Sequence, residues 1–202
     1  MGFSIESPIL KKLLKDKRKL VYHFSSTSQY PVYYRIGGGR YWKIFTNFQP
    51  QFILNGEKSV SSRENYLYLD TAVLNNAVIS ILSSTLFYWY FIITTNCRDL
   101  NPSDLNEFPI NLDLLSEKEI AELTNLCNQL MADYKEKSQL KEKTSSLTGH
   151  IVYQEFYPRF SKSIIDEIDC VLAQHYGLTD EDVDFIINYD IKYRMGKESE
   201  ED

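Results

Sequence analysis

Cationic and aromatic side chains alternate around a run of three glycines early in the chain. The set consists of Tyr33, Tyr34, Arg35, Gly37, Gly38, Gly39, Arg40, Tyr41, Trp42 and Lys43. Glycine lets a backbone approach a partner closely, cations hold phosphates, arginine pairs bidentately with guanine, and aromatic rings stack on bases. The pattern therefore predicts a turn that binds nucleic acid. The alternative is a buried aromatic hairpin whose arginines extend to solvent along their apolar stems.

An uncharged run that begins at Thr71 leads into a second polar segment, which contains Asn96, Arg98 and Asp99. A loop held by a buried helix is rigid enough to present side chains to base edges. Arg63, in an earlier polar link, is a further cation suited to the same role. The alternative is a structural role for this loop, in which Arg98 and Asp99 pair with neighbouring groups of the chain and only fix the end of the helix.

Residue types that perform catalysis or bind metals occur without a recognisable motif. The cysteines and histidines are isolated in the sequence, so neither a disulfide framework nor a metal site is expected. Asp166, Glu167 and Asp169 lie within one predicted helix, where clustered charge is typical of a solvated face. We therefore expect no catalytic residue and no metal site in this chain, and a binding or specificity module is the better class.

The strands that must position these residues follow from β-branched and aromatic runs and from turn signals. Residues 30–36 and 40–45 are expected to form strands on either side of the glycines. Asn55 and Gly56 are a hairpin signal, and residues 52–54 and 66–69 could pair around that turn.

The uncharged run is long enough to cross a bilayer, but several Asn, Ser and Thr residues interrupt it and no basic cluster flanks it closely. We expect instead one helix over about residues 74–87 or beyond, buried on nearly every face as the central element of the core. Later helices are expected at 116–134, 163–176 and 179–187, with residues 135–146 as a mobile connection. The predicted fold class is α+β, with N-terminal mixed or antiparallel strands around a buried central helix, followed by a mainly helical C-terminal half.

Charge is distributed unevenly along the chain. Residues 1–69 hold 11 Lys and Arg against 4 Asp and Glu, although the net charge of the whole chain is −6. A basic first third permits one focused anionic partner. We divide the chain into a basic helix at 1–20 that ends an upstream connection, an α/β core at 21–112, a helical part packed on that core at 113–196, and a disordered acidic tail at 197–202. No signal peptide is recognised, so a cytoplasmic protein without membrane contact is expected.

Several segments occur in an order that resembles a known family. They are YYRIGGGRYWK at 33–43, LFYWY at 86–90, CRDLN at 97–101 followed by FPI at 108–110, and the ending from IDEID at 165–169 through HYGL to FIINYDIKYRM at 185–195. Together they resemble the C-terminal target-recognition region of type IIG restriction–modification enzymes, which carry an N6-adenine DNA methyltransferase. The element from LN to FPI is also similar to one in the specificity subunits of type I systems.

This resemblance implies that the chain binds double-stranded DNA and positions it for a methyltransferase and an associated endonuclease of the same or a neighbouring polypeptide. Such a parent enzyme uses S-adenosylmethionine and Mg²⁺. This sequence contains no glycine-rich S-adenosylmethionine motif, methyltransferase tetrad or nuclease motif, so we expect the chain alone to bind no cofactor and to catalyse nothing. The expected DNA-binding residues are Arg35, Gly38, Gly39, Arg40, Tyr41, Trp42, Lys43, Arg63, Asn96, Arg98 and Asp99. The alternative is a protein-docking module of a restriction–modification complex without direct base contacts.

Overall fold

A three-stranded antiparallel sheet forms one side of the structure. The computed structural model describes residues 5–15, 17–37, 43–95, 97–146 and 149–189. In this sheet β1 (Tyr30–Arg35) lies between β2 (Phe45–Thr46) and β5 (Glu64–Leu69). One face of the sheet packs on helix α2 (Ala72–Ser83), because alternate residues of β1 and β5 are apolar. The strand expected at 30–36 is confirmed, but the one expected at 40–45 is found only at its end. Strand β2 begins at Phe45 and pairs with β1, Lys43 and Ile44 lie outside any strand, and 40–42 lie outside the described residues.

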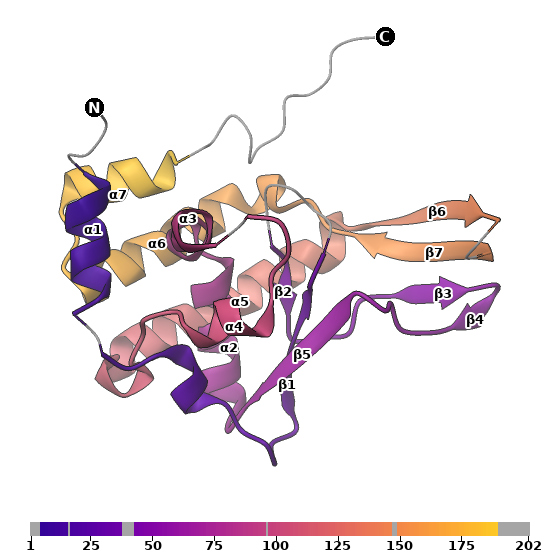
Figure 1. Cartoon of the computed structure of the whole chain (residues 1–202), viewed down its shortest axis with the longest axis horizontal. Coiled ribbons are helices and arrows are strands. Elements are labelled where there is room, and N and C mark those ends of the chain that lie inside the picture. The colour runs from indigo at the N-terminus through magenta and orange to yellow at the C-terminus, as the bar shows by residue number, and fades with distance from the viewer. Residues whose placement is uncertain (1–4, 16, 38–42, 96, 147–148, 190–202) are drawn as a thin grey trace, which may run out of the picture.

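A second antiparallel sheet projects away from the helices (Figure 1). Its order is β4-β3-β7-β6, from β3 (Phe52–Leu54), β4 (Glu57–Lys58), β6 (Gln139–Ser145) and β7 (Gly149–Glu155). The predicted hairpin turn is confirmed, since Asn55 and Gly56 both have positive φ, 52° and 88°. The predicted pairing of 52–54 with 66–69 is wrong, because β3 pairs with β4 and β7 while β5 pairs with β1.

The segment expected to be a mobile connection, residues 135–146, is ordered. It completes helix α5 (Glu117–Lys137) and then forms β6, which pairs with β7 over seven residues. Charged side chains are acceptable there because β6 is an edge strand and most of its residues are exposed. The second sheet therefore takes strands from both sides of the predicted boundary at residue 112.

The uncharged run forms two buried helices and not the single helix that we expected. Helix α2 ends at Ser83, helix α3 (Thr85–Thr94) begins at once, and their axes are bent by 62°. Ser84 makes the break, because its Oγ accepts a hydrogen bond from the Phe87 amide at 3.0 Å and donates one to the Ile81 carbonyl at 2.6 Å. In the described part of the chain no single helix is long and apolar enough to span a membrane, although this bent pair passes that test together.

A buried carboxylate caps the second of these helices. Asp169, only 3% exposed, accepts hydrogen bonds from the amides of Thr85 (3.1 Å) and Leu86 (2.9 Å). Free amides and the positive end of the helix dipole favour a negative charge at this position. The expectation that the acidic cluster at 166–169 is a solvated face is therefore wrong for Asp169.

The remaining helices surround this core. They are α1 (Glu6–Leu13), α4 (Pro102–Asn106), α6 (Lys162–Tyr176), α7 (Asp180–Ile187) and the short 3₁₀ helices η1 (Leu20–His23), η2 (Leu112–Leu114) and η3 (Pro158–Ser161). Helix α1 lies beside α7 (Figure 1), where the Lys12 ammonium is 2.6 Å from the Asp182 carboxylate. Ile9 and Leu13 of α1 are fully buried in the same core as the strands and the late helices. The α+β class and the helical second half are confirmed.

Candidate nucleic-acid interface

Backbone hydrogen bonds bring three separate segments together at the end of β1. The amide of Ile36 donates to the carbonyl of Arg63 at 2.9 Å, and the amide of Leu100 donates to the carbonyl of Ile36 at 2.8 Å. The chain beyond β1 is thus held between the link that precedes β5 and the loop that follows α3. As a consequence Arg35, Arg63 and Arg98, which are far apart in sequence and all exposed, belong to one region of the surface. We call these residues the arginine cluster.

The first glycine of the run is what allows this approach. A Cβ atom on Gly37 would lie 2.9 Å from Asp99 Oδ1 and 3.0 Å from Arg63 Nη1, so both side chains cross close to its backbone. Gly37 is itself buried. The absence of a side chain at Gly37 therefore makes room for two predicted site residues of the same chain.

Lys43 lies on the inner side of this region. It is 6% exposed, its Nζ lies 5.2 Å from the centroid of the Phe91 ring, and it approaches the Arg98 carbonyl oxygen at 3.5 Å. Burial lowers the pKa of this ammonium group, and the nearby Asp99 and Asp104 carboxylates oppose that shift. Lys43 thus supports the loop from beneath, and this conformation does not offer it to phosphates.

The loop from Cys97 to Leu100 is fixed at both ends. Cys97 has a φ of 60°, uncommon for a residue other than glycine, and its Sγ donates to the Ile92 carbonyl at 3.2 Å. At the other end the Asn101 amide donates to Asp104 Oδ2 at 2.7 Å within the capping box of α4. The Cys97 thiol, the Asp104 carboxylate and Lys43 thus hold this loop, within which Arg98 is exposed.

The outer face of the three-stranded sheet carries Tyr33, which belongs to the predicted aromatic set, and also Tyr66 and Tyr68, which the sequence did not single out as site residues. The rings of Tyr33 and Tyr66 lie 6.4 Å apart and those of Tyr66 and Tyr68 5.3 Å apart, both edge to face. Tyr66 is 54% exposed, and the paired residues Arg35 and Glu64 share this face. Burial, with the nearby Tyr68, Glu64 and Tyr66, raises the pKa of Tyr33. The available signal was strand alternation, since every second residue of 64–68 and of 31–35 points the same way.

The other predicted site residues, Gly38, Gly39, Arg40, Tyr41, Trp42 and Asn96, lie outside the described residues. Their two flanks, Gly37 and Lys43, are in the region just described. Within the described ranges, no group of three or more His, Cys, Asp or Glu side chains could hold a metal ion. Comparison with protein-family models, with curated proteins and with solved structures finds no match.

Proposed function

We propose that this chain is a DNA sequence-recognition domain of a restriction–modification enzyme. It would hold duplex DNA for an adenine-N6 methyltransferase, and an associated endonuclease, that another domain or polypeptide supplies. The observation that supports the proposal is the arginine cluster, which draws exposed cations from three segments to one surface. Sequence readers need this arrangement, because several cations must hold the backbone while a few rigid side chains reach base edges.

The chemistry of the cluster suits both tasks. Arg35, Arg63 and Arg98 provide planar donors that bind phosphate or guanine bidentately. Main-chain hydrogen bonds at 2.8 and 2.9 Å hold the three segments that carry these arginines together. S-adenosylmethionine and Mg²⁺ would act in the methyltransferase and endonuclease parts, and this chain would supply only the binding of DNA.

A salt series on the purified chain tests the proposal. We expect labelled mixed-sequence duplexes to bind in fluorescence anisotropy at low salt, with log K falling by about 0.9 per decade of salt for each phosphate contact. Arg63→Ala should reduce the magnitude of this slope by about one. Lys118→Ala, an exposed cation on helix α5, is the control and should leave the slope unchanged. Absence of binding even at low salt would favour the alternative, a protein-docking module without base contacts.

Arg40 separates base reading from phosphate binding. If it reads a base, Arg40→Ala in the complete enzyme should cost about 1–3 kcal/mol on the cognate site and much less on scrambled duplexes. The exposed Lys17 gives the control variant Lys17→Ala. Equal losses on cognate and scrambled DNA would remove Arg40 from the base readers, and an earlier thermal melt would assign it a structural role.

A further inference from the structure

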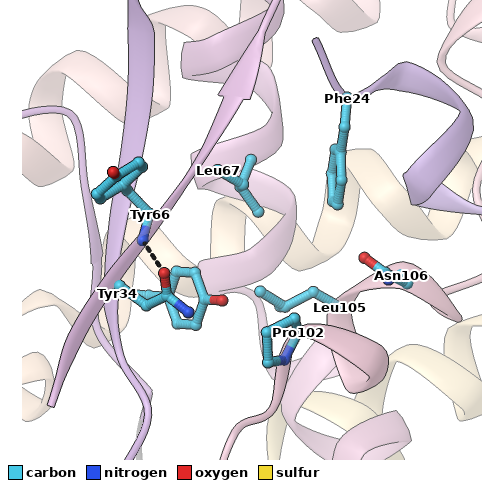
Figure 2. Close-up of a pocket in the computed structure, with 8 residues that line it drawn as sticks. Phe24, Tyr34, Tyr66, Leu67, Pro102, Leu105 and Asn106 are labelled. Carbon is cyan, nitrogen blue, oxygen red and sulfur yellow. Dashed lines mark hydrogen bonds between the residues drawn. The ribbon is translucent and has the colours of Figure 1, made fainter. Parts of the chain in front are cut away.

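A small hollow lies between strands β1 and β5 and helix α4 (Figure 2). Its volume is about 220 Å³. Phe24, Leu67 and Leu105 provide apolar walls, and the Tyr34 ring lies beside Leu105 and Pro102 of helix α4. The hollow is therefore formed by β1, β5, the residue after η1 and the short helix α4.

Three polar groups that line this hollow have no hydrogen-bond partner in the described part of the chain. The Tyr34 hydroxyl, the Asn65 Nδ2 amide and the Asn106 side-chain amide make no hydrogen bond within the described part of the chain. Asn65 Oδ1 accepts the Tyr66 amide at 2.9 Å, which fixes the Asn65 side chain. Burial, together with the charge of Asp104, raises the pKa of Tyr34 to about 12, so its hydroxyl keeps its proton. The hollow thus offers both donors and acceptors.

No residue that lines the hollow carries a charge. A neutral ligand is therefore favoured, with flat apolar faces for the phenylalanine, tyrosine and leucine walls. Its edge should carry several donors and acceptors to satisfy the two asparagines and the tyrosine. A nucleobase has these properties, since its faces stack on aromatic rings and its Watson–Crick edge alternates donors and acceptors.

Strand alternation connects the hollow to the cations. Tyr34 pairs with Asn65 on the inner face of the sheet, and the next pair, Arg35 with Glu64, is on the outer face. Arg98 precedes helix α4, whose Pro102 and Leu105 line the hollow. Three of the four segments that form the hollow, all except the one that carries Phe24, thus carry or directly follow a residue of the arginine cluster.

From this geometry we infer that the hollow receives one unpaired base of a nucleic-acid strand whose phosphates the arginine cluster holds. The inference rests on the proposed function and specifies it. Asn65 and Asn106 would bind the edge of the base, while Phe24 would contact its ring.

The test compares hairpin duplexes that carry a one-nucleotide bulge, either A, C, G or T, with the same duplex carrying an abasic bulge. We expect the full chain to bind at least one base-containing bulge about tenfold more tightly than the abasic one. Asn106→Leu, which keeps the size of the side chain and removes its amide, should abolish that difference while abasic binding stays the same. Asn125→Leu, at an exposed amide on α5, is the matched control and should retain it. Thermal melts confirm that each variant is folded.

The outcomes distinguish this inference from the function on which it rests. Equal affinity for base-containing and abasic bulges overturns the base site and leaves DNA binding standing. Absence of binding by every duplex at low salt overturns both. Binding of free deoxynucleosides is measured as well. If they bind and Asn106→Leu abolishes their binding, while base-containing and abasic bulges bind equally, then the hollow binds a heterocycle as a small molecule. That result overturns the inference that it receives a base of a nucleic-acid strand.

Discussion

Removal of the Asp169 carboxylate should destabilise the fold more than removal of an exposed charge. Its two oxygens accept the amides of Thr85 and Leu86 at the first turn of α3. Hydrogen bonds to a charged group contribute about 1.5–3 kcal/mol each, and a buried amide left without a partner carries a further penalty. We therefore expect Asp169→Ala to lower the free energy of unfolding by about 3–5 kcal/mol.

Asp169→Asn tests how much of this stabilisation requires the charge and both oxygens of the carboxylate. An asparagine can accept only one of the two amides, and its NH₂ group then faces the other donor. The free energy of unfolding of Asp169→Asn should therefore lie between those of the alanine variant and the native protein, about 2–4 kcal/mol below the native value. Urea unfolding followed by circular dichroism measures both values, and about 4 kcal/mol corresponds to a fall in Tm of roughly 8–16 °C for a chain of this size.

Glu167→Ala is the control on the same helix, because Glu167 is exposed and should change stability by less than about 0.5 kcal/mol. A loss below about 1 kcal/mol for Asp169→Ala would refute the reasoning. It would mean that Ser84 alone begins α3 and that the buried carboxylate contributes little.

Two further predictions concern the interface and the contact between α1 and α7. Gly37→Ala should lower the free energy of unfolding by less than about 1 kcal/mol, because the added Cβ meets the ends of the Arg63 and Asp99 side chains. By displacing these side chains it should nevertheless weaken DNA binding in the same anisotropy assay. Unchanged binding would exclude both side chains from the interface. Burial opposes ionisation of Asp182, but hydrogen bonds from Lys12 and Thr179 outweigh it and hold the pKa of this carboxyl below its usual range. A carboxyl group whose pKa is lower in the folded than in the unfolded state stabilises the fold at pH values above its unfolded pKa, and this stabilisation is lost as the pH falls through its folded pKa. The free energy of unfolding should therefore decrease below about pH 5. Asp182→Asn should flatten that part of the curve of stability against pH.

Local features of the fold follow well from the sequence. The helices expected to begin at residues 116 and 179 do begin there, each with a capping box, Ser116 with Glu119 and Thr179 with Asp182. Gly177 ends α6 with a φ of 62°. These features depend on residues three or four positions apart, so their physics is complete within a short window of sequence.

Features that depend on distant partners could not be predicted in the same way. The bend at Ser84 is supported by Asp169, more than eighty residues later. Strand β6 has the composition of a mobile connection because its Lys and Glu residues are poor strand formers, yet seven pairs with β7 hold it. The pairing of β5 with β1 does not follow from the Asn-Gly turn, since that turn predicts a hairpin without naming which later strand supplies the partner.

The candidate interface shows the same division between local and distant causes. Cations and glycines in the sequence indicate an affinity for phosphate, but the convergence of Arg35, Arg63 and Arg98 depends on where α3 ends. That end depends in turn on the bend at the start of α3, because a straight continuation of α2 would carry the loop at 97–100 away from Ile36. Lys43 connects helix α3 to the loop that follows it, since its ammonium group lies over the Phe91 ring of α3 and approaches the Arg98 carbonyl oxygen. Burial of this lysine thus places a supporting cation under the loop, while Arg35, Arg63 and Arg98 are exposed.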